Sequence, residues 1–355
     1  LDLCAAPGGK STQLAGRMAG EGLLVCNEIV PNRAKILAQN IERMGVKNAV
    51  VLNHSPQELE VRFPAFFDRI VVDAPCSGEG MFHKEEAALT EWSPENVQMC
   101  AQRQRDILAC AVNMLCPGGV LVYSTCTFAP AEDEDMIRWL LDKYPDLTLQ
   151  PIDTAALDIS DGEIRGTGRI YPHRQRGEGH FVARLMKGGI RLPRQSAVRM
   201  SDDSSGKRDK KGKKKMKDAA PTDAWAGYEA FAKQYLRCEL NGCRQMFGDQ
   251  LYLVPQEMPD LRGMKVLRPG LHLGTDKKNR FEPSHALALA LRADQVSQVC
   301  ETDEPEQYLR GMTLGCDPAL DGWVLVAYQG MPLGWGKASR GVVKNHYPKG
   351  LRINW

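Results

Sequence analysis

The 355-residue sequence lacks the features that would place it among membrane, secreted or zinc-binding proteins. No apolar run approaches the roughly 18 to 20 residues that span a bilayer, and no signal peptide is visible. The 11 cysteines form no C-x-x-C pair and no Cys/His cluster, which argues against a disulfide framework or a structural zinc site. We therefore expect a cytoplasmic protein with reduced thiols, no bound metal and no membrane association.

The composition is that of a protein with two or three folded domains, and charge divides the chain. Hydrophobic residues make up 43% of the sequence and charged residues 25%. Residues 189–222 hold eleven Lys and Arg against four Asp, which predicts a disordered basic linker. This linker is either a solubilising tether or an arm attracted to nucleic-acid phosphates. Because Leu1 already lies in an apolar, strand-like triplet, we expect an N-terminal portion to be missing.

Before this linker, short apolar strands alternate with amphipathic helices over residues 1–188. Such alternation predicts a parallel sheet with right-handed crossovers, in which ligands bind beyond the carboxyl ends of the strands. The predicted strands are 1–3, 23–26, 49–52, 69–72 and 120–123, and the predicted helices are 10–18, 31–44, 95–115 and 131–143.

The residues that follow the first two strands suggest a ligand site. In "CAAPGGKS", Gly8 and Gly9 permit a tight turn, and the helix that follows offers its N–H groups to an anionic group. The segment matches neither a P-loop nor the dinucleotide pattern G-x-G-x-x-G. Glu28 follows the second strand, where a carboxylate can accept hydrogen bonds from a ribose diol. Taken alone, Glu28 is more typical of a solvated turn.

Two cysteines follow two further strands. Cys76 stands in "VVDAPCSGEG" after Asp73 and Pro75, and Cys126 stands in "VYSTCTF". Taken singly, each is more typical of an inert core thiol. Three other cysteines lie in or beside one helical pattern, and we interpret them as packing residues: Cys100, Cys110 and Cys116.

Four segments identify a family. "LDLCAAPGGKSTQLA", "DAPCSGEGMF", "YSTCTFAPAEDE" and "RIYPHRQRGEGHFVARL" occur in this order over residues 1–186. Together they resemble the RNA (cytosine-5) methyltransferases of the Sun/NSUN type, above all the bacterial members that act on small-subunit ribosomal RNA. The resemblance implies a Rossmann-like fold that uses S-adenosylmethionine. It also implies an N-terminal RNA-binding extension, which we expect to belong to the missing portion.

The resemblance gives the two cysteines unequal roles. A thiolate that adds to C6 of cytosine moves electron density to C5, which is otherwise too weak a nucleophile to take a methyl group. By resemblance Cys126 is this nucleophile, Cys76 resolves the adduct and releases the product, and Asp73 contacts the base. The residues that the resemblance places around the cofactor are Cys4, Ala5, Ala6, Pro7, Gly8, Gly9, Lys10, Glu28, Arg33 and Asp73.

Two further regions are candidates for RNA contact. The segment from Arg169 to Arg184 combines a closing strand with a loop, and contact of Arg169 or His173 with RNA is as plausible as a purely structural role. From Trp323 to Trp355 the chain has basic and aromatic residues and no Asp or Glu, which suits unpaired RNA. Alternatively, the rings of this second region form the core of a small barrel. The residues proposed for RNA there are Trp335, Lys337, Lys344, Tyr347 and Lys349.

We therefore expect an α/β protein with a Rossmann-like, S-adenosylmethionine-dependent methyltransferase domain at 1–188. A small α+β domain at 223–300 should follow, with a helix in "AWAGYEAFAKQYL" and a strand at 250–254, and then a PUA-like β-barrel RNA-binding module at 301–355. The expected function is methylation of cytosine C5 in 16S ribosomal RNA through a covalent cysteine–C6 adduct, by a monomer that acts on the RNA or the 30S particle. A transfer RNA cytosine-5 methyltransferase and a non-catalytic RNA-binding ribosome-assembly factor remain the alternatives.

Overall fold

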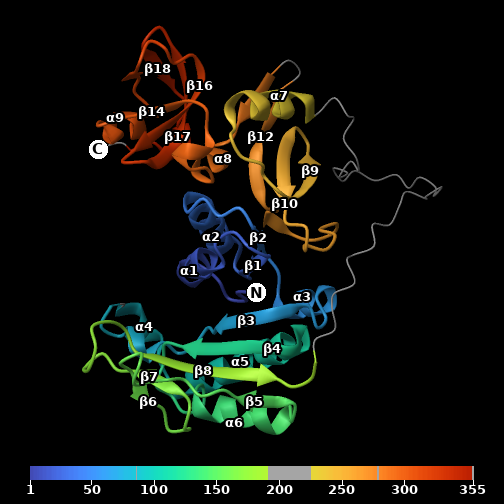
Figure 1. The fold of residues 1–355 in the computed structure, drawn as a ribbon. Coiled ribbons are helices and arrows are strands. Elements are labelled where there is room, and N and C mark those ends of the chain that lie inside the picture. Colours follow the sequence, from blue (N-terminus) through green and yellow to red (C-terminus); the bar gives the residue numbers. More distant parts are fainter. Residues whose placement is uncertain (85, 191–224, 278–279, 354–355) are drawn as a thin grey trace, which may run out of the picture. The chain divides into compact units, whose positions relative to one another are not determined.

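The computed structural model describes residues 1–355 except 85, 191–224, 278–279 and 354–355 (Figure 1). From residue 191 on, the predicted linker at 189–222 lies outside the described residues. The chain divides into two compact units. The first consists of Leu1–Ala6, Val25–Ala34 and Leu52–Ser196, and the second of Pro7–Leu24, Lys35–Val51 and Ala197–Trp355. Within the described residues, no helix has the length and apolar character needed to cross a membrane.

The first unit is built around a mixed six-stranded sheet. Its strands β3 and β4 run parallel, whereas β8 runs antiparallel to β4, so the prediction of a parallel sheet is wrong for β8. Across the sheet the order is β3 (Phe67–Asp73), β4 (Leu115–Thr125), β8 (His180–Lys187), β7 (Gly168–Ile170) and β6 (Ser160–Asp161), and β5 (Leu147–Leu149) pairs with β8.

The predicted strand at residues 1–3 is reduced to a single bridging residue. Asp2 forms parallel bridges to Cys26 of β1 (Leu24–Asn27) and to Val71 of β3. Because these segments run in the same direction, the residues that follow each of them emerge at one edge. That edge carries the functional site.

Helices cover the sheet of the first unit. α5 (Pro94–Met114) begins at Ser93, whose hydroxyl accepts the Asn96 N–H, and it packs against β3 and β4 (Figure 1). The helix predicted at 95–115 is therefore confirmed to within a residue. The other helices of this unit are α3 (Pro56–Arg62), the 3₁₀ helix η1 (Glu79–Met81), α4 (Glu86–Glu91) and α6 (Glu134–Lys143).

The second unit contains the elements predicted early in the chain and those of its C-terminal half. The early elements are α1 (Gly9–Met18), most of α2 (Pro31–Arg43) and β2 (Ala49–Leu52), close to the ranges predicted for them. The helix and strand predicted after the linker are α7 (Ala226–Tyr235) and β10 (Gln250–Val254), and both are confirmed.

Two sheets form the C-terminal half. An antiparallel sheet has the order β13 (Arg280–Pro283), β12 (Leu271–Lys277), β10 and β9 (Cys243–Phe247). The other has the order β14 (Val299–Glu301), β16 (Gly322–Tyr328), β17 (Met331–Ser339), β18 (Val342–Asn345) and β15 (Leu314–Gly315). The remaining elements are β11 (Val266–Arg268), α8 (His285–Leu289), η3 (Ala293–Gln295), α9 (Pro305–Leu309) and η4 (Lys349–Leu351).

Trp335 lies in the core of this half and not on its surface. Its side chain is 2% exposed, and its indole N–H donates to the Ser284 carbonyl at 2.9 Å. The ring meets Phe231 edge-on, with 5.5 Å between the ring centroids. This position corrects the expectation that Trp335 stacks on RNA, because a ring enclosed by the protein offers no face to a base.

Candidate active site

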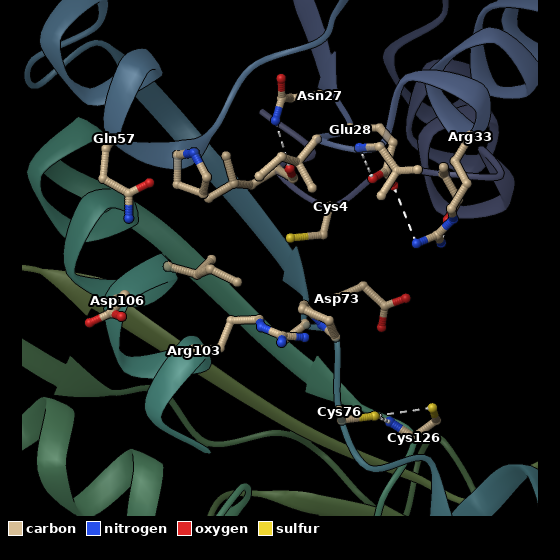
Figure 2. A pocket seen from close by; sticks show the side chains of 18 residues that line it. Cys4, Asn27, Glu28, Arg33, Gln57, Asp73, Cys76, Arg103, Asp106 and Cys126 are labelled. Atoms are coloured by element: carbon tan, nitrogen blue, oxygen red, sulfur yellow. Dashed lines mark hydrogen bonds and ion pairs between the residues drawn. The ribbon is translucent and has the colours of Figure 1, made fainter. Parts of the chain in front are cut away.

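A cavity of about 640 Å³ opens at the strand-end edge of the first unit (Figure 2). This volume falls within the range of about 300–1,000 Å³ that is usual for small-molecule sites. Seven of the predicted catalytic and cofactor residues line it together, namely Cys4, Ala6, Glu28, Arg33, Asp73, Cys76 and Cys126.

Glu28 is a buried and fixed carboxylate, 3% exposed. It follows β1, where one carboxylate oxygen accepts the Val30 N–H at 2.8 Å and the other lies 3.6 Å from the Arg33 guanidinium. Arg33 in turn donates to the Ala6 carbonyl at 2.8 Å. Glu28 is therefore not a solvated turn residue, and its placement suits a carboxylate that holds a polar ligand.

The two cysteines are in direct contact. Their sulfur atoms are 3.2 Å apart, and the backbone N–H of Cys126 donates to the Cys76 sulfur at 3.3 Å (Figure 2). The hydrogen bond with Cys126, followed by burial, raises the pKa of the Cys76 thiol far above its usual range. Cys76 is thus held as a thiol that can donate to the Cys126 sulfur.

Asp73 ends β3 on the same wall of the cavity. One of its carboxylate oxygens accepts the Ser124 hydroxyl at 2.7 Å. Because Ser124 lies near the end of β4, two residues before Cys126, this bond ties the end of β3 to the strand that leads into the second cysteine. Figure 2 shows Asp73 between Cys4 and the cysteine pair.

The other residues predicted for the cofactor have different positions. Ala5 is buried and donates its N–H to the Asn27 carbonyl at 2.8 Å. Pro7, Gly8, Gly9 and Lys10 belong to the second unit, where Pro7 and Gly8 precede α1 and Gly9 and Lys10 begin it. Gly8 has φ of 114°, and a Cβ there would lie 3.1 Å from the Leu37 side chain, so this turn requires glycine.

Several lining residues were not predicted from the sequence. Asn27 donates to the carbonyls of Leu3 and His54 at 3.2 and 3.0 Å, and so joins the ends of neighbouring segments. Arg103, Asp106 and Ile107 come from one face of α5, and their i, i+3, i+4 spacing was the signal that could have found them. The others are Leu3, Ile29, Val30, Pro56, Gln57 and Ala74.

Arg169 is buried, which corrects its predicted contact with RNA. Its side chain in β7 donates to both carboxylate oxygens of Glu134, at 3.0 and 2.6 Å, and lies 3.0 Å from an oxygen of Asp133. With a residue exposure of 4%, this guanidinium is committed to two buried carboxylates and cannot meet a phosphate. His173, in contrast, is exposed beside the Tyr171 ring.

The lysines predicted to bind RNA are exposed. Lys337 of β17 pairs in register with Lys344 of β18, and Lys349 opens the short helix η4. Tyr347 is half-buried, with ring contacts to Tyr308 and His285, so it belongs partly to the core. The placement of the three lysines is compatible with a role in RNA binding.

The mixed sheet, with a cavity beyond its strand ends, is the arrangement of an α/β domain that binds a ligand at that edge. Residues 1–186 match the family of the 16S rRNA methyltransferase RsmB/F. Residues 230–291 match the RsmF rRNA methyltransferase first C-terminal domain, and residues 300–353 match the methyltransferase RsmF PUA domain.

Individual proteins are also similar to this chain. The ribosomal RNA small subunit methyltransferase F of Klebsiella pneumoniae is 33% identical over 99% of this chain and 72% of its own length. The protein of the same name from Escherichia coli is also 33% identical, over 99% of this chain and 72% of its own length. The structure of NSun6 from Pyrococcus horikoshii, solved with SFG, is 31% identical and covers 53% of this chain and 47% of that chain, with a TM-score of 0.47.

The chain belongs to the 16S rRNA methyltransferase RsmB/F family. Membership confirms three expectations from the sequence. These are the family resemblance, the α/β methyltransferase fold followed by a further C-terminal domain and a PUA domain, and the assignment as an RNA methyltransferase.

Proposed function

We propose that the protein methylates C5 of a cytosine in small-subunit ribosomal RNA, with S-adenosylmethionine as methyl donor and Cys126 as nucleophile. The observation that carries this proposal is the 3.2 Å contact between the sulfur atoms of Cys76 and Cys126 at the wall of the cavity. The relatives named as small-subunit ribosomal RNA methyltransferases support this class of RNA.

The cavity residues fit S-adenosylmethionine. Glu28 and Asp73 present carboxylates to the cavity, which suits a ligand with a ribose diol and positive charge. Because Glu28 is buried, its carboxylate is better stabilised by hydrogen bonds from a ligand than by bulk water. When bound, S-adenosylmethionine supplies an electrophilic methyl group.

Cys126 and Asp73 prepare the cytosine to accept this group. The Cys126 thiolate forms a bond from its sulfur to C6, and the C5–C6 double-bond electrons move to C5, which becomes nucleophilic. Asp73 lies on the same wall, where its carboxylate can accept a hydrogen bond from the N4 amino group at the N3/N4 edge of the base and so orient the ring for attack. The target base must be unpaired or flipped out for a thiolate to reach C6.

Cys76 acts after methyl transfer. The largest cause of its raised pKa is the hydrogen bond with Cys126, and bonding of the Cys126 sulfur to C6 removes that partner's negative charge. Cys76 then ionises more readily, gives its proton to solvent at the cavity, and as a thiolate can take the proton from C5. The C5–C6 double bond re-forms as the sulfur–C6 bond breaks, and Cys126 leaves as a thiolate.

Two substitutions test these roles. We expect Cys126→Ala to abolish transfer of labelled methyl groups from S-adenosylmethionine to unmodified small-subunit ribosomal RNA. Cys76→Ala should instead trap a covalent protein–RNA adduct that survives a denaturing gel. The matched control is Cys110→Ala, because Cys110 is a buried thiol on α5 that does not line the cavity.

The same assay separates the alternatives. Full activity of Cys126→Ala would overturn the assignment of the nucleophile. Methylation of transfer RNA in place of ribosomal RNA, located by bisulfite sequencing, would replace the substrate. Tight RNA binding with no methyl transfer by the unmodified sequence would favour a non-catalytic assembly factor.

A further inference from the structure

Three consecutive carboxylates lie close to the chain segments that carry the cysteine pair, and all three are fully buried. Glu132, Asp133 and Glu134 each have 0% exposure in the first unit. Burying a carboxylate is costly unless donors satisfy it, so the partners of each side chain show what its burial achieves. The three side chains bind different partners.

Glu132 holds the loop that carries Cys76. Its carboxylate accepts the Ser77 hydroxyl at 2.5 Å, the Ser77 N–H at 3.1 Å and the Gln104 amide at 2.7 Å. The Gln104 amide also donates to the Pro75 carbonyl at 3.0 Å. Both chain neighbours of Cys76 are therefore fixed through this one carboxylate.

Asp133 holds the segment that carries Cys126. It accepts the hydroxyl of Thr125, the residue directly before Cys126, at 2.6 Å, and its other oxygen lies 3.0 Å from the Arg169 guanidinium. The next residue of the acidic run is different. Glu134 receives two hydrogen bonds from Arg169, which is not a chain neighbour of either cysteine.

We propose that Glu132 and Asp133 are positioning residues with separate tasks, in which Glu132 aims Cys76 for adduct release and Asp133 aims Cys126 for attack. The inference rests on the proposed function and deepens it. A sulfur–sulfur contact of 3.2 Å requires both backbone segments to be held at once. Misplacement of a reacting group by about 1 Å can lower a rate on the order of 100-fold, so each anchor should control its own step.

The test compares two near-isosteric substitutions in single-turnover reactions with unmodified small-subunit ribosomal RNA. Glu132→Gln replaces an oxygen acceptor of Ser77 or Gln104 with an amide donor, so we expect slower release and accumulation of the covalent adduct. Asp133→Asn places an amide against Thr125 or Arg169, so we expect slower adduct formation. For each step we expect a loss of about 10- to 100-fold. Glu134→Gln is the matched control, and it should leave the ratio of the two rates unchanged.

Two further measurements keep the test independent of stability. Ser77→Ala and Thr125→Val remove the donors in place of the acceptors, and should reproduce the release defect and the attack defect respectively. In a Cys76→Ala background, Glu132→Gln should have no further effect on adduct lifetime, whereas Asp133→Asn should still slow adduct formation.

Some outcomes would overturn the inference. If Glu132→Gln and Asp133→Asn reduced both steps equally, or if Glu134→Gln had the same effect, the acidic run would only support the fold. If Cys76→Ala trapped no adduct and Cys126→Ala remained active, the proposed function itself would fail, and that result is distinct because it involves neither carboxylate.

Discussion

The cysteine pair is surrounded by buried polar side chains, whereas the core of the C-terminal half consists mainly of buried aromatic rings. Around the cysteines the first unit encloses polar side chains that bind one another, such as Ser77, Gln104, Thr125 and Glu132. The C-terminal half instead encloses a cluster of aromatic rings: Trp225, Tyr228, Phe231, Tyr235, Phe281 and Trp335.

This difference shows which region is built for stability and which for precise placement. Burial of a large ring stabilises the fold by itself, and a smaller ring in its place keeps part of that stabilisation. Burial of a carboxylate is favourable only while its partners remain, so removal of one partner exposes the full desolvation cost. We expect substitutions near the cysteines to be less forgiving than substitutions in the aromatic core.

The largest expected effect comes from Arg169→Leu. This change leaves Asp133 and Glu134 buried without their cation, and breaking such a group typically destabilises by about 3–5 kcal/mol. Amide hydrogen exchange in β4 and β8, followed by mass spectrometry, measures the loss locally. The control is Arg138→Leu, which breaks an exposed pair with Asp135 and should cost at most about 1 kcal/mol. Equal effects of the two changes would contradict the contrast.

The next effect is a pH dependence that Asp133 confers. Burial raises its pKa from an ordinary 3.8 to about 7, against the opposing influence of Thr125 and Arg169. A carboxyl group whose pKa is higher in the folded chain stabilises the fold fully below its unfolded pKa, and this contribution is lost as the pH rises through 7. Asp133→Asn does not titrate. The stability of the unsubstituted protein relative to Asp133→Asn should therefore fall by about 3 kcal/mol between about pH 4 and pH 8.

Urea unfolding at several pH values measures this difference. Asp135→Asn is the control for loss of a carboxylate, because Asp135 lies at the exposed surface of α6. A pH-independent difference for Asp133→Asn would show that folding does not raise the pKa of Asp133.

Local patterns predicted the elements and the strand-end residues, because these depend on neighbours in the sequence. The strands β2 and β10 were predicted with their observed bounds, and Glu28, Asp73, Cys76 and Cys126 do line one cavity. These results follow from hydrophobic periodicity and from the rule that sites form beyond strand ends.

Long-range pairing was beyond the reach of the same patterns. Arg169 looked like a loop cation because Glu134, which binds it, lies 35 residues away. A basic residue directly before Ile170 and an uninterrupted Glu-Asp-Glu-Asp run at 132–135 were the available signals, but neither shows that the two meet. The prediction that Trp335 contacts RNA was wrong for a related reason. An aromatic residue in an alternating strand has the same spacing whether its side chain faces the core or RNA.

Within the aromatic core, Trp335→Phe tests whether a smaller ring is tolerated better than the loss of a partner near the cysteines. The change removes part of the ring and the hydrogen bond to the Ser284 carbonyl, so we expect a loss of about 1–2 kcal/mol. Hydrogen exchange should accelerate in β16 and β17 and remain unchanged in β4. Trp139→Phe on α6, where the ring is half-buried, is the control in the first unit. Faster exchange in β4 upon Trp335→Phe would show that the two regions do not respond separately.

The smallest effect on stability should come from the lysines that remain candidates for RNA binding. Lys337, Lys344 and Lys349 are exposed, so their replacement by alanine should each change the free energy of unfolding by no more than about 0.5 kcal/mol. If they contact phosphates, the triple variant should bind RNA more weakly, and the slope of log affinity against log salt should fall by about 0.7–0.9 per lysine. Lys233→Ala on α7 removes an exposed charge from outside this set and is the matched control. An unchanged salt slope would exclude these three lysines from the RNA contact. A reduced slope without loss of stability would show that these lysines bind the substrate and do not hold the fold.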